Sequence, residues 1–233
     1  MNLTMKSFWA GVRAESPLLV GVFPFGLIYG ALALAAGLSP AAAQMMSSIV
    51  FAGSSQFVAA QLVHDSAPGL VIVLTIGVVN LRHVLYSASV APYIEHLPAP
   101  WKTILAYLLT DEAYAATIIH YEEDGFTPTS HWFFLGAGLV LWTTWQVSSA
   151  LGIFLGAAIP SSWPLDFALP LTFIAMVMPV LKDKPVIAAA LSAGTVALLM
   201  FSLPYRLGLI LAALAGIFIG TYLENRKSPK EAL

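Results

Sequence analysis

The sequence predicts an all-α integral membrane protein, a polytopic bundle of about eight transmembrane helices of which at least one is broken. Hydrophobic residues make up 59% of the 233 residues, charged residues make up 9%, and the mean hydropathy is +0.84. Soluble domains carry roughly 25% charged residues. This chain therefore has too little charge to cover a soluble surface, and we expect residues 1–233 to form one transmembrane domain.

Eight segments have the length and composition of a membrane span, which needs about 20 apolar residues. They are residues 17–36, 41–63, 68–93, 101–121, 131–159, 165–181, 185–203 and 206–223. The short segment 165–181 could instead be re-entrant, which would leave seven crossings. We expect residues 1–16 to be a cytoplasmic or interfacial N-terminus and residues 224–233 to be a cytoplasmic tail.

Basic residues predict the orientation, because cytoplasmic loops are enriched in Lys and Arg. They cluster at Lys6 and Arg13, at Arg226, Lys227 and Lys230, and at Lys182 and Lys184. Both termini are then cytoplasmic, which requires an even number of crossings. The acidic loop 122–124 would also be cytoplasmic, and Arg206 fits less well because it would lie near the outer face.

Residues 68–78 and 185–195 are a candidate internal repeat, since Pro, Leu, Thr or Ser, and Gly occupy the same positions in both. Such repeats are common in secondary transporters. Chance similarity between two apolar sequences is the alternative. Eight full crossings would give both copies the same orientation, and an inverted repeat would need one segment that does not cross.

The composition excludes several classes of function. A net charge of −2 argues against a nucleic-acid partner, and the absence of cysteine excludes disulfides and thiolate chemistry. No nucleophile, zinc-protease or phosphate-loop motif is present, and no His, Asp or Glu spacing is typical of a metal site. We therefore expect neither an enzyme nor a cofactor.

A polar run, Gly53-Ser54-Ser55-Gln56, lies between Phe51 and Phe57 in the middle of span 41–63. Glycine costs about 1 kcal/mol relative to alanine in a helix, so the run predicts a discontinuous helix. The N-terminus of a half-helix suits a carboxylate. The alternative is a small-residue packing face, which Ser47 and Ser48 support; Gln56 favours the break, because its amide must be satisfied.

A second polar group, Asn80-Leu81-Arg82-His83, lies in span 68–93. Arg82 could snorkel to the interface, pair with Asp111 or Glu112, or hold a carboxylate bidentately. A charge at the centre of a membrane helix costs roughly 2.5–3.5 kcal/mol on insertion scales. Asn80 favours another local break, and His83 is more typical of a packed imidazole than of a proton relay.

The third group is Asp111-Glu112 in span 101–121. Helical spacing puts Tyr107, Asp111 and Tyr114 on one face of this span, and Glu112 points about 100° away, towards a neighbouring helix or a partner subunit. A carboxyl in a low-dielectric environment can carry a proton near neutral pH, as a proton-coupled transporter requires. The alternative is a permanent, inert pair with Arg82.

Two later segments carry weaker signals. The stretch 142–149 in span 131–159 is polar and small, which favours packing between helices over the lining of a cavity. Met176 and Met178 in span 165–181 could line an apolar pocket, although methionine is more common in a core.

Residues 51–57, 80–83 and 109–113 resemble the AzlC family, and the resemblance extends from about residue 11 to residue 222. It implies the large subunit of a two-component branched-chain amino-acid permease in a bacterial inner membrane, with a small hydrophobic AzlD-type partner. The family includes exporters.

The resemblance and the polar groups together predict a site for a branched-chain amino acid. Gly53 to Gln56, Asn80 and Arg82 would hold the carboxylate. Asp111 would receive the ammonium or the coupling proton, with Glu112, Tyr107 and Tyr114 beside it, while Phe51, Phe57 and the methionines would form the apolar pocket. We expect proton-driven export; the alternatives are an import-direction permease, an uncoupled channel, or a scaffold subunit whose partner carries the pathway.

Overall fold

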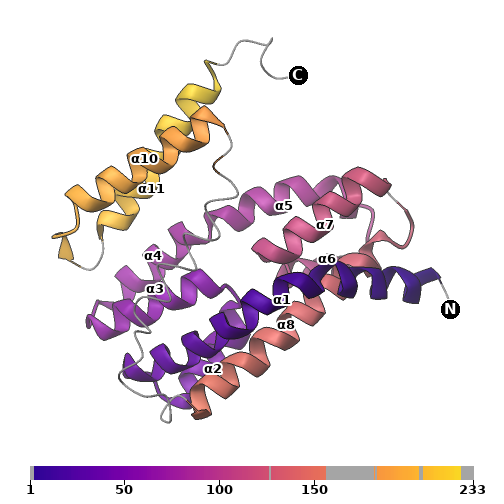
Figure 1. Ribbon diagram of the computed structural model, residues 1–233, viewed down its shortest axis with the longest axis horizontal. Coiled ribbons are helices and arrows are strands. Elements are labelled where there is room, and N and C mark those ends of the chain that lie inside the picture. The colour runs from indigo at the N-terminus through magenta and orange to yellow at the C-terminus, as the bar shows by residue number, and fades with distance from the viewer. Residues whose placement is uncertain (1–2, 126, 156–180, 182, 205–206, 227–233) are drawn as a thin grey trace. The chain divides into compact units, whose positions relative to one another are not determined.

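The computed structural model describes residues 3–125, 127–155, 181, 183–204 and 207–226. All regular structure in these residues is helical, which confirms the predicted all-α class. The chain divides into two compact units (Figure 1). Segment 165–181, with Met176 and Met178, lies outside the described residues.

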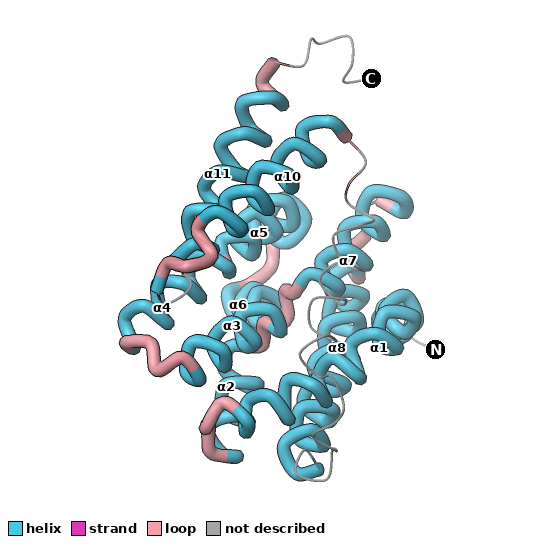
Figure 2. The backbone as a smooth tube through the Cα atoms, turned by 60° about the vertical axis from the view of Figure 1, so that its left-hand side comes forward, coloured by secondary structure: helices cyan, strands magenta, loops and turns pink. Residues whose placement is uncertain are grey.

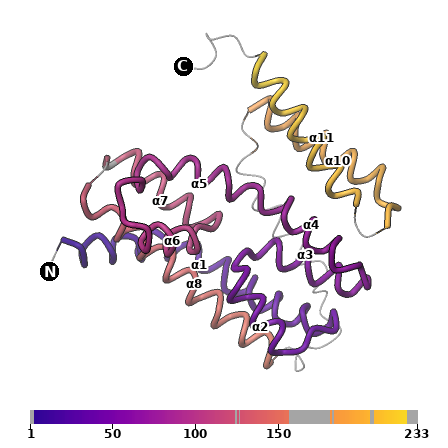
Figure 3. The backbone as a smooth tube through the Cα atoms, turned by 180° about the vertical axis from the view of Figure 1, so that it is seen from behind, coloured from indigo at the N-terminus to yellow at the C-terminus, as the bar shows by residue number. Residues whose placement is uncertain are grey.

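The described residues of the first unit form seven helices. They are α1 (Leu3–Ala35), α2 (Pro40–Val50), α3 (Gly53–His64), α5 (Leu81–Ile94), α6 (Ala99–Tyr107), α7 (Asp111–Asp124) and α8 (Ser130–Leu155). The second unit contains α4 (Gly69–Val79), α10 (Lys184–Leu199) and α11 (Leu207–Glu224), of which α10 and α11 pack together as a helical hairpin (Figure 3).

Four stretches of the described helices are long and apolar enough to cross a membrane: Leu3–Ala35, Gly69–Ile94, Ser130–Leu155 and Leu207–Glu224. They agree with predicted spans 17–36, 68–93, 131–159 and 206–223, and the shorter α10 agrees with span 185–203. Spans 41–63 and 101–121 are each divided into two short helices, and span 68–93 is interrupted at Asn80 between α4 and α5. The number of crossings stays a prediction.

Helix α1 is continuous over 33 residues, and it passes through Pro17 and Pro24 without a break. The predicted boundary between an N-terminal segment 1–16 and the first span is therefore not a break in the helix. Helix α8 explains the continuity, because it lies alongside α1 (Figures 1 and 2) and packs against both ends of it. Backbone groups that a proline frees in a membrane helix are tolerated where neighbouring helices cover them.

Glycines bring the backbones of α1 and α8 into direct contact. A methyl group at Gly11 would collide with the carbonyl of Phe133, and one at Gly152 would collide with the carbonyl of Leu27. Residue numbers rise together along the two helices, so α1 and α8 run parallel. Small residues are the usual means by which membrane helices approach closely, and this pair forms the frame of the first unit.

We expect Gly152→Ala to destabilise the protein by about 1–3 kcal/mol, the usual cost of overpacking. The added methyl group must push α1 away from α8. The midpoint of thermal unfolding in detergent should fall relative to the wild type.

Gly77→Ala in α4 and Gly194→Ala in α10 are matched controls, since nothing lies within 4 Å of the added methyl group at either position. Both should unfold at or above the wild-type temperature, because alanine favours helix by about 1 kcal/mol. Equal midpoints for Gly152→Ala and the controls would contradict the close α1–α8 contact.

Candidate functional site

The predicted break in span 41–63 is confirmed, and it lies at Phe51 and Ala52, immediately before the polar run. Helix α2 ends at Val50, Phe51 adopts the left-handed conformation (φ 40°, ψ 49°), and α3 begins at Gly53. A non-glycine residue in this conformation costs roughly 1–2 kcal/mol, so the surrounding packing must hold it. Gly53 to Gln56 therefore form the first turn of α3 rather than the break itself.

Two hydrogen bonds between Ala52 and Gln56 hold the start of α3. The backbone N–H of Ala52 donates to Gln56 Oε1 at 3.2 Å, and the N–H of Gln56 donates to the Ala52 carbonyl at 3.0 Å. The leading N–H groups of a helix have no partner within it, and they carry the positive end of the helix dipole. Gln56 itself is fully buried, and its Nε2 has no partner among the described residues.

A second break occurs at Asn80, as the sequence predicts. Asn80 separates α4 from α5 and precedes the first turn of α5, but its side chain does not cap that helix. Instead, Asn80 Oδ1 accepts a hydrogen bond from Ser55 Oγ at 2.6 Å. The first turns of α3 and α5 are therefore joined directly.

A third break overturns the prediction of a continuous helix over residues 101–121. Helix α6 ends at Tyr107, and α7 begins at Asp111 behind Thr110, whose Oγ1 accepts from the N–H of Ala113 at 3.5 Å. Tyr107 therefore lies on a different helix from Asp111 and Tyr114, and its predicted place on their common face is wrong. An N-cap threonine followed by two acids is favourable at a helix start, which explains why the chain breaks here.

Arg82 and Asp111 form the ion pair at the centre of the site. Arg82 Nη1 lies 2.8 Å from Asp111 Oδ2, and Arg82 Nη2 donates to Ser54 Oγ. The hydroxyl of Tyr86 donates to Asp111 Oδ1 at 2.7 Å. Arg82 is thus paired rather than snorkelled, and the first turns of α3, α5 and α7 meet at one pair of opposite charges.

The ion pair is not sealed. The side chain of Arg82 is 25% exposed and that of Asp111 is 21% exposed. A fully buried pair would be a structural lock, whereas both side chains of this pair keep some accessible surface. Three positive helix ends around it favour an anionic group.

Tyr86, which the sequence prediction missed, completes the surroundings of Asp111. Its ring stacks on Tyr114 with centroids 4.5 Å apart, and the hydroxyl of Tyr114 donates to Ser89 Oγ at 3.0 Å. Tyr86 follows Arg82 by four residues, so helical spacing could have identified it. His83 packs edge-on against Tyr86, as a packed imidazole would.

Tyr107 lies away from this ion pair. Its hydroxyl donates to the carbonyl of Ser48 and accepts from Trp142 Nε1 at 2.7 Å, while its ring contacts Phe51 with centroids 5.9 Å apart. Tyr107 therefore ties α6 to the end of α2 and to α8. This is a packing role at the helix break.

Phe57 and Phe51 are both buried in packing contacts. Phe57 is 1% exposed and stacks on Phe25 with centroids 4.5 Å apart, within a cluster that also contains Tyr29 and Trp145. Gly53 lets this cluster reach the first turn of α3, because a methyl group there would lie 3.1 Å from the Trp145 ring. The cluster packs against α3, which carries the polar run of the site.

Polar side chains hold α2 against α8, which confirms the packing interpretation of Ser47, Ser48 and residues 142–149. Gln146 Oε1 accepts from Gln44 Nε2 at 2.8 Å and from Ser48 Oγ at 2.9 Å. Ser47 Oγ donates to Ser149 Oγ at 3.1 Å. These bonds fix α2 just before the break at Phe51.

Glu112 points towards a neighbouring helix, one of the two predicted directions. It interacts electrostatically with Asp111 and Arg82, and also with Glu15 of α1. The sequence prediction missed Glu15, because it assigned residues 1–16 to a segment outside the membrane. An acid inside a 33-residue apolar helix is the signal that could have found it.

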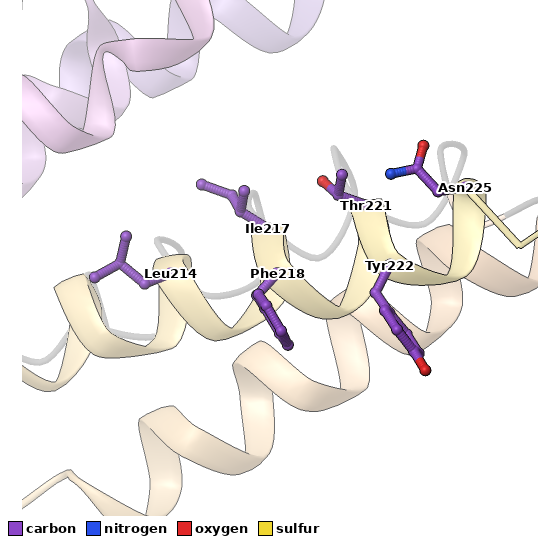
Figure 4. Close-up of a pocket in the computed structure, with 6 residues that line it drawn as sticks. All are labelled: Leu214, Ile217, Phe218, Thr221, Tyr222 and Asn225. Carbon is purple, nitrogen blue, oxygen red and sulfur yellow. The ribbon is translucent and has the colours of Figure 1, made fainter.

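Two hollows in the described residues are lined by neither residue of the ion pair. One, of about 290 Å³, is lined by residues of α5, α6 and α8 that include Val90, Lys102 and Phe134. The other, of about 580 Å³, lies along α11 and is lined by Leu214, Ile217, Phe218, Thr221, Tyr222 and Asn225 (Figure 4). The second is a shallow, mainly apolar groove on one helix. In the described part of the chain, no three His, Cys, Asp or Glu residues are grouped as metal ligands.

Comparison with known proteins identifies one protein family. The AzlC protein family matches residues 17–159, more than half of the chain. The chain is 31% identical to an uncharacterized membrane protein of Archaeoglobus fulgidus over 90% of this chain and 92% of the relative. It is 27% identical to the inner membrane protein YgaZ of Escherichia coli over 92% of this chain and 88% of the relative.

A further relative is the branched-chain amino acid transport protein AzlC of Bacillus subtilis, which is 27% identical over 72% of this chain and 67% of the relative. No solved structure matches the chain. The resemblance predicted from residues 51–57, 80–83 and 109–113 is confirmed. The chain therefore belongs to the AzlC family of membrane transport proteins.

Proposed function

We propose that this protein exports branched-chain and similar apolar amino acids in exchange for protons, and that the Arg82–Asp111 pair is its substrate site. The observation that carries the proposal is the partly exposed pair of opposite charges at three helix N-termini. A zwitterionic amino acid carries the two complementary charges. It can therefore insert between Arg82 and Asp111 and replace each partner of the pair.

In this arrangement the substrate carboxylate takes the place of Asp111 on the Arg82 guanidinium. The free N–H groups at the start of α3 and the hydroxyl of Ser54, which already contacts Arg82, add further donors. Asp111 then receives the ammonium, with Tyr86 still bonded to its other oxygen. Breaking the Arg82–Asp111 pair is tolerable only because each of its charges gains a partner of opposite charge on the substrate.

Exchange for protons follows if Asp111 binds either the ammonium or a proton, since a protonated carboxyl cannot neutralise the ammonium. Mutually exclusive binding at one group couples outward movement of substrate to inward movement of protons. An import-direction permease would need the opposite rule: protonation of Asp111 would release Arg82 for the substrate, and both would bind together. An uncoupled channel would show neither rule, and a scaffold subunit would bind no substrate.

We place the protein in the inner membrane of a bacterium, with both termini in the cytoplasm. The basic residues near both ends support this orientation, and the relative YgaZ is named an inner membrane protein. The family resemblance supports a small hydrophobic AzlD-type subunit as partner. Co-purification from native membranes and transport by the large subunit alone would distinguish a complete transporter from a scaffold.

We expect Arg82→Ala and Asp111→Asn each to reduce efflux of labelled valine or leucine from cells by about 10- to 100-fold, because each leaves one charge of the site without its partner. Arg13→Ala and Glu123→Gln are matched controls at exposed positions, and both should retain normal efflux. Wild-type efflux in both site variants would remove the pair from the mechanism.

The pH dependence of binding tests the exchange rule. Affinity of the purified protein for labelled leucine should fall as the pH falls, because the exchange rule makes proton and substrate compete for one site. Equilibrium binding across a range of pH measures this directly. Affinity that rises as the pH falls would instead indicate the import-direction rule, and affinity that does not change would indicate an uncoupled pathway.

Variants with a single introduced cysteine test the orientation without background labelling, because the chain contains no cysteine. With an impermeant thiol reagent applied to intact cells, Lys6→Cys, Glu123→Cys and Arg226→Cys should remain unlabelled until the cells are permeabilised. Glu95→Cys, in the predicted outer loop, should be labelled at once. Labelling of Lys6→Cys in intact cells would contradict a cytoplasmic N-terminus.

A further inference from the structure

Glu15 is a buried acid whose carboxyl group has no hydrogen-bond partner. It belongs to the stripe of α1 that is buried in the first unit, together with Gly11, Val22 and Gly26. Its exposed fraction is 0%, and neither Oε1 nor Oε2 contacts a donor among the described residues. Nothing in the substrate site uses it.

Among the described residues, helices α8, α2 and α3 place no Lys or Arg against Glu15. Contacts of Gly11 with Phe133 and of Gly26 with Ser148 place Glu15 level with about residues 137–141 of α8, where the buried residues are apolar. Helix α8 contains no Asp, Glu, Lys or Arg, and its one histidine is near its start. Helix α2 has no titratable residue, and α3 has only a histidine at its far end.

Helix α7 packs against α1, and Glu112 of α7 interacts electrostatically with Glu15. His120 of α7 stacks on Phe133, whose carbonyl contacts Gly11. On α1 itself, Arg13 is exposed and lies two residues away, on a different face. An ionised carboxylate without a partner is very costly in such a place, and it becomes neutral instead. Two carboxyl groups that face each other cannot both be ionised at low cost.

Glu112 connects this acid to the substrate site. It follows Asp111 in the first turn of α7, and it interacts electrostatically with Asp111, with Arg82 and with Glu15. Glu112 therefore interacts electrostatically both with the ion pair and with the buried acid of α1, and α1 packs against α7. Glu15 lies in the N-terminal half of α1, which the proposed orientation directs towards the cytoplasm.

We propose that Glu15 is a proton-binding site of the transporter, and that it receives through Glu112 the proton that Asp111 gives up. The inference rests on the proposed exchange of amino acid for protons. The proton leaves the Asp111 carboxyl, binds the Glu112 carboxylate, and passes to the Glu15 carboxylate. Asp111 is then ionised and pairs again with Arg82, as in the structure, while Glu15 holds the proton until it leaves towards the cytoplasm.

The test uses the full chain, as it purifies, in liposomes loaded with labelled leucine. Two rates are compared: exchange of internal for external leucine, which needs no net proton movement, and leucine movement driven by an imposed pH gradient. Glu15→Gln should keep exchange within about threefold of the wild type and lose at least about tenfold of the gradient-driven movement, a range typical of coupling between sites.

Two further variants distinguish a loss of coupling from misfolding. Glu15→Met has similar length without buried polar oxygens, so it should fold and lose coupling in the same way, whereas Glu15→Asp should restore coupling in part with a shifted pH profile. Glu123→Gln, at the exposed end of α7, should behave as the wild type. Normal gradient-driven movement in Glu15→Gln or Glu15→Met would overturn the inference.

Infrared spectroscopy gives a readout that does not depend on transport. The wild type near neutral pH should show the carbonyl band of a protonated carboxylic acid, and Glu15→Gln should lack it while Glu123→Gln retains it. An unchanged band in Glu15→Gln would show that Glu15 does not hold the proton. A wild type that holds the proton at Glu15 and moves no leucine would refute the proposed function and leave the proton site standing.

Discussion

The meeting of three helix N-termini at one ion pair is the constraint on which the rest of the first unit depends. The leading N–H groups of a helix have no partner within it, and such groups are costly in lipid. Bonds among Ser54, Ser55, Asn80, Arg82 and Asp111 join the first turns of α3, α5 and α7. Each break in a helix is therefore stabilised by the other two, and no single half-helix could remain in the membrane without them.

The surrounding helices fix the positions of the helix ends at these breaks. The close glycine contacts of α1 and α8 form a rigid pair, and polar bonds to α8 fix α2 just before its end. The aromatic cluster of Phe25, Tyr29, Phe57 and Trp145 supports α3 from behind. A strained residue such as Phe51 persists only where packing on both sides determines it. The site is thus rigid around a pair of charges that can change partners.

Sequence reasoning found the charges because they are rare in apolar segments, and it found the break before Gly53 because Gly, Ser and Gln are poor helix residues there. It missed the break at residues 108–110, since Leu-Leu-Thr does not weaken a helix by composition. Thr110 followed by Asp111 and Glu112 is nevertheless a helix-start pattern. Tyr107 was therefore placed on the wrong helix. Glu15 was missed because residues 1–16 were assigned to a segment outside the membrane, although an acid within a long apolar helix is a local signal.

The exchange mechanism follows from chemistry that one pair of side chains can perform. Arg82 stays charged under all physiological conditions, so the carboxylate of Asp111 is the variable partner. It can be neutralised by Arg82, by an ammonium or by a proton, and each choice excludes another. A proton-coupled exporter needs a group at which substrate and proton compete. The partly exposed carboxylate of Asp111 can be that group.

The most direct measurement of this account is an experimental structure of the protein with a bound branched-chain amino acid. The account predicts density between Arg82 and Asp111, with the carboxylate on the guanidinium and the start of α3, the ammonium on Asp111, and the direct contact between the two side chains opened. A closed Arg82–Asp111 pair with the amino acid bound elsewhere would contradict it.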